Sequence, residues 1–163
     1  MLDMVIEALT QMGIPLLVLI VAAQWWSSKE RVHVRHVCIS SGISFLAALG
    51  LNQIVILFEH RVRPYDAGLT HLIVSPSTDW SFPSDHATAA FSIAAAFLLH
   101  RIWGRGLVFL VLAAIISLTR VYVGTHYVSD LIGGAAMAFA TAILVAYLYP
   151  EGSRLDRFAT GIL

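Results

Sequence analysis

Five long apolar segments occupy most of this 163-residue chain and constrain what it can fold into. They run over residues 4–26, 37–58, 85–103, 106–123 and 126–149. A helix needs about 20 apolar residues to cross a bilayer. Charged residues make up 12% of the chain, about half of the roughly 25% that is usual in soluble domains. The sequence therefore predicts an all-α integral membrane protein, in which residues 1–163 form a single domain built as a bundle of about five transmembrane helices.

Five crossings determine which polar segments share a side of the membrane. The amino terminus, the loop 59–84 and a turn at Gly124 fall on one side. The other side holds seven of the ten basic residues, namely Lys29, Arg31, Arg35, Arg101, Arg105, Arg154 and Arg157. Because positively charged loops are retained in the cytoplasm, this second side is predicted to be cytoplasmic. The loop 59–84 and the Gly124 turn are therefore expected to face the exterior or periplasm of a cell membrane.

Three clusters of ionisable residues lie beside these segments, all on the predicted outer side. They are Arg61-Val62-Arg63-Pro64, then Phe82-Pro83-Ser84-Asp85-His86, and finally Arg120 with His126 and Asp130. Such residues are costly near the hydrocarbon, about 2.5–3.5 kcal/mol each at the centre of a spanning helix. His126 and Asp130 are four residues apart, so on a helix the carboxylate can orient the imidazole. A functional site is expected here, with the loop 59–84 carrying part of it.

The residue types in these clusters suit a phosphate group. Guanidinium groups match phosphate oxygens in geometry and charge, and the free N–H groups at the start of a helix near Asp85 and His86 attract an anion. Two histidines beside a phosphate offer one nucleophile and one general acid.

The same residues carry a resemblance to a known family. Arg63-Pro64, Pro83-Ser84-x-His86, and Arg120 followed by His126 and Asp130 resemble the three-part signature of the type 2 phosphatidic acid phosphatase superfamily. Within it, Glu59-x-x-x-Arg63-Pro64-Tyr65 and Phe82-Pro83-Ser84-Asp85-His86 look most like the bacitracin-resistance (BcrC-type) undecaprenyl-diphosphate phosphatases. The resemblance covers the chain from the second apolar segment to the fifth.

The resemblance implies a mechanism and a role for each residue. His126 would attack the terminal phosphorus and form a phosphohistidine, while Asp130 would orient it. His86 would protonate the leaving oxygen and then activate water. The phosphate would be held by Arg63, Arg120, Ser84 and the backbone amides around Asp85. Further residues expected to contact the substrate or support the site are Glu59, Arg61, Pro64, Pro83 and Thr119.

The chain departs from the superfamily pattern at several positions. A lysine usual seven residues before the arginine-proline pair is Ile56 here, so one phosphate contact is absent or supplied by another residue such as Arg61. The usual glycine between Ser84 and His86 is Asp85, and the usual serine before Arg120 is Thr119. Five predicted spans replace the six that are common in the superfamily.

Other ligands and partners are less compatible with the sequence. Zinc held by His86, His126 and Asp130 would need a fourth ligand and would be repelled by the arginines. Neither a metal nor another cofactor is therefore expected. The single Cys38 lies in an apolar segment and can form no disulfide within the chain. The zero formal net charge provides no footprint for nucleic acid. The expected partners are a lipid phosphate and the bilayer.

Three functions remain open on the sequence alone. The first is a phosphatase that acts at the outer face on undecaprenyl diphosphate, or on another lipid phosphate such as phosphatidic acid, phosphatidylglycerol phosphate or a lipid A phosphate. The second is a small transporter, although its ionisable residues should then extend through the membrane. The third is a catalytically inactive scaffold, which the missing lysine at Ile56 keeps open. Elsewhere, Asn52 is expected to form an interhelical hydrogen bond, and His33, His36 and His100 are expected at the cytoplasmic interface.

Overall fold

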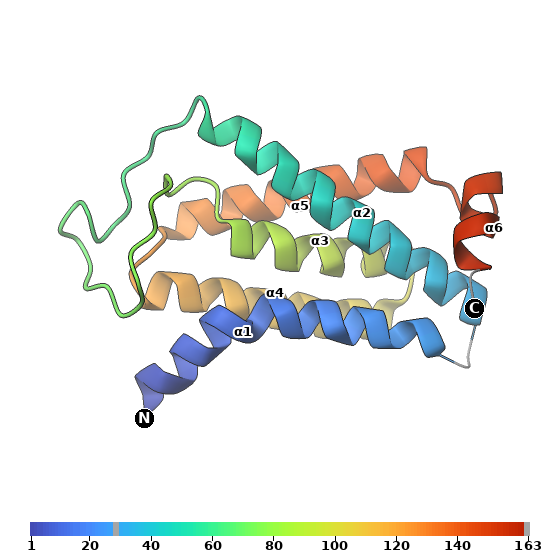
Figure 1. Ribbon diagram of the computed structural model, residues 1–163, viewed down its shortest axis with the longest axis horizontal. Coiled ribbons are helices and arrows are strands. Elements are labelled where there is room, and N and C mark those ends of the chain that lie inside the picture. Colours follow the sequence, from blue (N-terminus) through green and yellow to red (C-terminus); the bar gives the residue numbers. More distant parts are fainter. Residues whose placement is uncertain (28–29, 162–163) are drawn as a thin grey trace.

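The computed structural model describes residues 1–27 and 30–161. Lys29, counted above among the cytoplasmic basic residues, lies outside the described residues. The elements are α1 (Leu2–Ala23), the 3₁₀ turn η1 (Gln24–Trp26), α2 (Arg31–Ile56), α3 (Asp85–Leu99), α4 (Trp103–Tyr122), α5 (Val128–Leu148) and α6 (Arg154–Thr160) (Figure 1). The described residues contain no strand. The predicted all-α class is confirmed.

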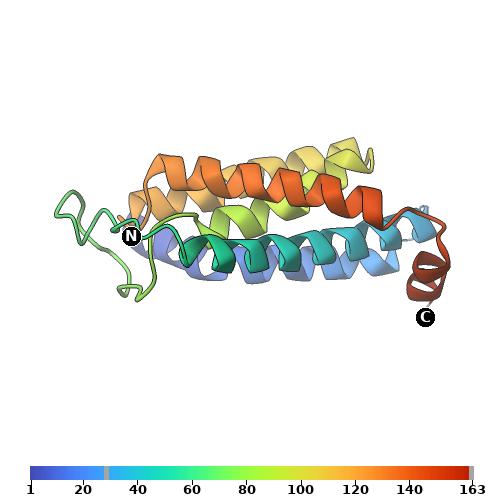
Figure 2. The same ribbon diagram turned by 90° about the horizontal axis from the view of Figure 1, so that it is seen from above.

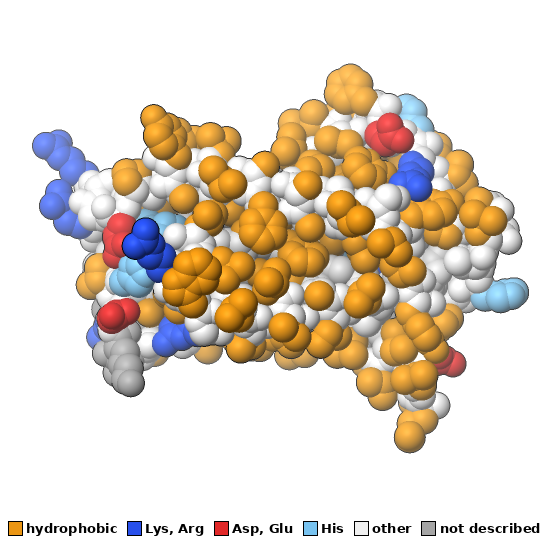
Figure 3. Space-filling model, turned by 180° about the vertical axis from the view of Figure 1, so that it is seen from behind, with side chains coloured by type: hydrophobic (Ala, Val, Ile, Leu, Met, Phe, Trp, Pro, Cys, Tyr) orange, Lys and Arg blue, Asp and Glu red, His pale blue; other side chains and the backbone are white. Residues whose placement is uncertain are grey.

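Four of these helices, α1, α2, α4 and α5, are long and apolar enough to cross a membrane. Apolar side chains cover the middle of the bundle, while charged side chains gather toward its two ends (Figure 3). Large side chains such as Leu46 and Leu107 are more than half exposed along this middle band. In water such a surface would be unstable, whereas in lipid it is the expected exterior. The chain is a multi-pass membrane protein.

Helix α3 differs from the predicted third span over residues 85–103. It has 15 residues, which at 1.5 Å per residue corresponds to about 22 Å, shorter than the roughly 30 Å hydrocarbon core. It lies at the centre of the bundle and packs against α2, α4 and α5 (Figures 1 and 2). Its small residues, such as Ala90 and Ala94, are fully buried. Small side chains allow this close packing of helix backbones.

The turn after α3 also lies earlier than predicted. The sequence placed it at residues 104–105, but α4 already begins at Trp103. The chain turns at His100 and Arg101, and Arg101 adopts a left-handed conformation with φ of 62°. A backbone in that region cannot continue a right-handed helix.

The end of the bundle that carries α6 contains the largest correction. Residues 27–36 were expected to form a polar loop, but α2 begins at Arg31. His36, expected at the interface, is fully buried, and its Nδ1 lies 2.8 Å from Asp156 Oδ1 in α6. The Arg35 guanidinium donates to the Thr160 carbonyl at 2.8 Å. Beyond the last predicted span, Arg154–Thr160 thus form a helix folded onto α2, and this packing buries His36, which the sequence pattern had assigned to the interface.

Candidate active site

The polar clusters from the sequence meet at the end of the bundle opposite α6 (Figure 1). The loop 59–84 covers the turn between α4 and α5, with Thr70 Oγ1 donating to the Gly124 carbonyl at 3.0 Å. Gly124 has φ of +82°, and a Cβ there would lie 2.6 Å from the His71 carbonyl oxygen. Only glycine allows this close approach without strain. The turn brings His126 beneath the loop.

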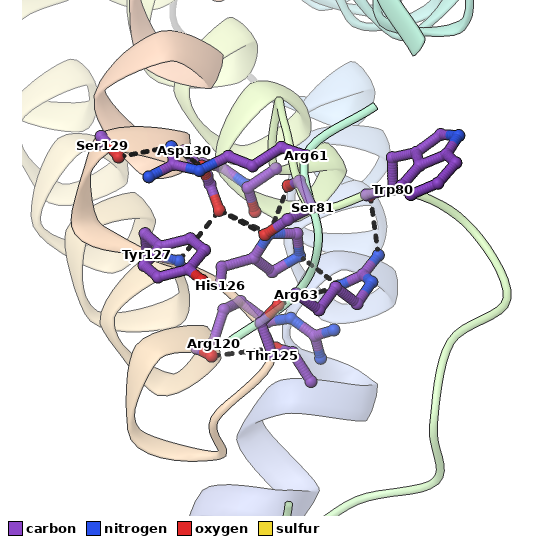
Figure 4. A network of polar contacts seen from close by, with 12 residues as sticks. Arg61, Arg63, Trp80, Ser81, Arg120, Thr125, His126, Tyr127, Ser129 and Asp130 are labelled. Atoms are coloured by element: carbon purple, nitrogen blue, oxygen red, sulfur yellow. Dashed lines mark hydrogen bonds and ion pairs between the residues drawn. The ribbon is translucent and has the colours of Figure 1, made fainter. Parts of the chain in front are cut away.

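The His126 imidazole is held at both ring nitrogens (Figure 4). Its Nδ1 lies 2.8 Å from the backbone carbonyl oxygen of Ser81, so Nδ1 carries the proton and donates it. Its Nε2 lies 3.2 Å from Nη1 of Arg63, which can only donate, so Nε2 accepts with its lone pair. The side chain is 5% exposed. The available lone pair therefore lies on Nε2, beside an arginine.

Asp130 lies in the first turn of α5 and is fully buried. Its Oδ1 accepts a hydrogen bond from Arg61 at 2.7 Å. Its Oδ2 accepts one from the Ser81 hydroxyl at 2.6 Å and one from the Tyr127 backbone N–H at 2.9 Å. The distance from Oδ2 to His126 Nδ1 is 3.5 Å. Asp130 is thus close to the histidine, as predicted, but its short contacts go to other groups.

Arg63 is anchored by the loop that precedes α3. Its Nη2 donates to Asp79 Oδ1 at 2.7 Å, and its Nε donates to the Asp79 carbonyl at 3.0 Å. Burial opposes ionisation of Asp79, but hydrogen bonds from Ser77 and Arg63 outweigh it and hold the pKa of Asp79 below its usual range. Nη1 also donates to the Thr125 carbonyl at 3.0 Å. The guanidinium is therefore fixed in orientation beside His126.

Arg120, in the last turn of α4, has a buried Nε that finds no hydrogen-bond partner among the described residues. Buried arginine donors are normally paired, so this group is available to an anion. Arg63 and Arg120 together make the region around His126 strongly positive. Burial, followed by these two charges, lowers the pKa of His126 below its ordinary value despite the opposing effect of Asp130. A low pKa keeps the imidazole neutral, as a nucleophile requires.

The start of α3 forms the floor of the site. Ser84 is its buried N-cap, with Oγ accepting from the Ala87 N–H at 3.5 Å. His86 interacts with the Thr10 backbone and lies near the charges of Arg120, His126 and Arg63. The Asp85 carboxylate accepts a hydrogen bond from Asn52 of α2 at 2.7 Å. The Asp85 side chain is therefore bound to α2, which leaves its backbone as the part available for the predicted phosphate contact.

The remaining predicted residues differ in their surroundings. Thr119 accepts a hydrogen bond from Thr10 of α1 at 2.8 Å. Pro64 is buried, and Pro83, also buried, follows a cis peptide bond. Glu59 is exposed at the end of α2. Arg61, considered as a substitute for the lysine missing at Ile56, is bound to Asp130 and stacks on the Tyr127 ring at 4.1 Å.

Among the residues in this arrangement that sequence reasoning missed are Thr10, Asp79 and Ser81. Asp79 and Ser81 lie in the predicted loop, but nothing in their spacing distinguishes them from ordinary loop residues. Ser81 acts in part through its carbonyl, which every residue carries. Thr10 lies in the first apolar segment, where a single threonine attracts no notice, and it is 1% exposed. What distinguishes Thr10 is its burial between α1 and α4, and this burial can be recognised only in the folded structure.

As to metals, no group of three or more His, Cys, Asp or Glu residues among residues 1–27 and 30–161 is placed to hold an ion. Arg61, Arg63 and Arg120 bring positively charged donors to the site, the kind of group that binds an oxyanion.

A bundle of membrane helices that brings His86, His126, Arg63, Arg120 and Asp130 together at one end is the arrangement expected of an integral membrane phosphatase. The model of the PAP2 superfamily matches residues 38–154, and the chain belongs to that superfamily. It is 31% identical over 159 residues to the undecaprenyl-diphosphatase BcrC of Bacillus subtilis, covering 96% of this chain and 77% of that protein. The predicted family resemblance is confirmed.

Two further comparisons define the extent of the likeness. The chain is 32% identical over 101 residues to an undecaprenyl-diphosphatase of Sulfolobus acidocaldarius, which covers 61% of this chain and 49% of that protein. The chain thus spans about half the length of the Sulfolobus protein. The fold is similar to the crystal structure of a transmembrane PAP2-type phosphatidylglycerolphosphate phosphatase from Bacillus subtilis, with a TM-score of 0.65 and 23% identity. That match covers 94% of this chain and 79% of the other chain.

Proposed function

We propose that the protein removes the terminal phosphate from a lipid diphosphate at the outer face of the cell membrane, through a phosphohistidine on His126. The observation that carries the proposal is the state of this imidazole. Its Nδ1 proton is bound to the Ser81 carbonyl, so the Nε2 lone pair lies beside Arg63. A phosphoryl group between Arg63 and Arg120 would be in reach of Nε2.

In the first step, Nε2 of His126 forms a bond to the terminal phosphorus while the bond from phosphorus to the bridging oxygen breaks. Arg63, Arg120 and the amides at the start of α3 hold the three equatorial oxygens, on which transition-state charge accumulates. His86 acts as the general acid: the anionic substrate bound beside it favours the protonated imidazole, which donates a proton to the leaving lipid phosphate. The positive charge gained by His126 is balanced by Asp130.

In the second step, the now neutral His86 takes a proton from water as the water oxygen attacks the phosphorus. The bond from phosphorus to Nε2 breaks, and inorganic phosphate leaves. His126 returns to its neutral form and His86 to its protonated form, so the cycle closes. The arginines supply the positive charge that a metal ion supplies in other phosphatases, and the mechanism therefore needs no metal.

Undecaprenyl diphosphate is the first substrate to test, because the BcrC and Sulfolobus relatives are named undecaprenyl-diphosphatases. Phosphatidylglycerol phosphate is the second, because the solved structure of similar fold is a phosphatase of that lipid. The outward orientation rests on the basic residues, which are concentrated at the α6 end. In this orientation the site would lie on the side where a lipid carrier is released as its diphosphate.

The test is phosphate release by the purified protein in detergent, with EDTA present, from undecaprenyl diphosphate, phosphatidylglycerol phosphate and phosphatidic acid in parallel. We expect release that is abolished by His126→Ala and fastest with undecaprenyl diphosphate. His33→Ala is the matched control, because His33 lies at the α6 end beside Glu151, and it should retain activity. Loss of release with EDTA would refute the metal-free mechanism. No release from any lipid would favour the inactive scaffold, with Ile56 as its cause.

A further inference from the structure

The contacts of Asp130 differ from those of a simple histidine–aspartate pair. Its two oxygens are 2.6–2.9 Å from donors on Arg61, Ser81 and Tyr127. The His126 Nδ1 is farther away, at 3.5 Å from Oδ2. Arg61 reaches this carboxylate from the loop at 2.7 Å, so a positive charge other than His126 lies directly against it.

Ser81 links all the parts of this arrangement (Figure 4). Its carbonyl accepts the Nδ1 proton of His126 at 2.8 Å, and its hydroxyl donates to Asp130 at 2.6 Å. Its own N–H donates to the Arg61 carbonyl at 2.9 Å. The side chain has no exposed surface. Ser81 thus supplies the acceptor for the Nδ1 proton of His126, the role expected of the Asp130 carboxylate. At the same time its hydroxyl binds Oδ2 of that carboxylate.

We propose that Ser81 is a positioning residue that, with Arg61, withholds the Asp130 carboxylate from His126 in the resting site. The neutral Ser81 carbonyl fixes the tautomer of the imidazole without adding a negative charge beside it. Asp130 then takes over Nδ1 when Nε2 has gained a phosphoryl group and the ring has become positive. The catalytic part of this inference rests on the proposed function, whereas the resting arrangement does not.

The charges around His126 explain why such an arrangement matters. Arg63, Arg120 and His86 approach it with positive or titratable groups, and Asp79 faces the far side of Arg63. Asp130 is the negative group that faces the ring. A carboxylate bound directly to an imidazole favours the charged form and raises its pKa by about 1–3 units. Such a histidine would be protonated over more of the neutral range and would have no lone pair for attack.

The experiment is an NMR titration of the protein labelled with [15N]histidine in detergent micelles, with His126 assigned by the signal lost in His126→Asn. In Ser81→Ala the freed Oδ2 can turn to Nδ1, and we expect the midpoint for His126 to rise by about one pH unit. Arg61→Gln, at a side chain that is 35% exposed, should shift it in the same direction with less risk to folding. Ser92→Ala removes a buried hydroxyl that binds the Thr88 carbonyl of its own helix and should leave the midpoint nearly unchanged.

The second readout is the pH dependence of phosphate release at low substrate concentration. In Ser81→Ala its acid limb should move upward with the NMR midpoint, whereas a merely structural loss would lower the rate at every pH without moving the limb. A midpoint that stays or falls in both Ser81→Ala and Arg61→Gln overturns the inference. Because the titration needs no substrate, it decides the resting arrangement even if the wild-type protein releases no phosphate, an outcome that would refute the proposed function alone.

Discussion

The contact between Asn52 and Asp85 allows a quantitative prediction about how this bundle is held together. Asn52 of α2 is fully buried, and its amide donates to Asp85 Oδ1 at 2.7 Å and to Thr88 Oγ1 at 2.9 Å. A hydrogen bond to a charged group contributes about 1.5–3 kcal/mol. Interhelical polar pairs in membranes average about 0.6 kcal/mol, because the separated helices find other partners. We expect Asn52→Leu, which keeps the volume, to lower the free energy of unfolding by about 2 kcal/mol.

A double-mutant cycle assigns this cost to Asp85. In an Asp85→Ala background, Asn52→Leu no longer leaves the Asp85 carboxylate without its partner, so it should lower the free energy of unfolding by only about 1 kcal/mol. The difference between the two backgrounds, the coupling energy, should then also be about 1 kcal/mol. Unfolding would be followed by circular dichroism during titration with SDS in mixed micelles. Ser92→Ala is the control, because its hydroxyl binds the Thr88 carbonyl of its own helix. Equal costs in the two backgrounds would refute the reasoning, since Asp85 would then not depend on Asn52.

Three further predictions concern the site itself. The rate of phosphate release at low substrate concentration should fall on the acid side as His126 becomes protonated. Because burial and the two arginines lower the pKa of His126, the midpoint of this fall should lie below the ordinary histidine value of about 6.5. A midpoint above 6.5 would contradict this prediction. Arg120→Lys should reduce kcat about 100-fold by removing the Nε donor and the planar fork, measured against wild type at saturating lipid, and an unchanged kcat would exclude Arg120 from phosphate binding. Gly134→Ala should lower the free energy of unfolding by about 1–3 kcal/mol, because the added Cβ would lie 2.9 Å from the Ser84 carbonyl oxygen. Gly42→Ala is the control in the same unfolding assay, because a Cβ at Gly42 would meet no atom of the described residues within 4 Å.

The main helices could be predicted from the sequence because lipid leaves the backbone of an apolar segment no other way to satisfy its hydrogen bonds. That argument weakens for α3, because a short buried core helix and a membrane-spanning helix can have the same apolar composition. It fails at the start of α2, where His36 is helical and buried because α6 folds onto it. A contact between residues 120 positions apart leaves no local pattern.

The candidate site shows the same division. The spacing of His126 and Asp130 predicted their proximity, and the outer-side clusters predicted that Arg63 would join them. The detailed hydrogen bonds could not be predicted, because they depend on the path of the loop. Ser81 contributes a carbonyl as well as a hydroxyl, and Asp79 binds Arg63 from a position that carries no motif. Arg61 is a basic residue in the right cluster, but only the fold shows that it binds Asp130.

The short central helix α3 has a consequence for how the protein is assembled in the membrane. A segment of about 22 Å cannot span the hydrocarbon alone without leaving polar groups at its ends in lipid. Its start carries Asp85 and His86, and these polar groups find their partners on α2 and α1. We therefore expect α3 to be inserted together with its neighbours rather than as an independent unit. The floor of the candidate site would then form late, after the helices that enclose it have come together.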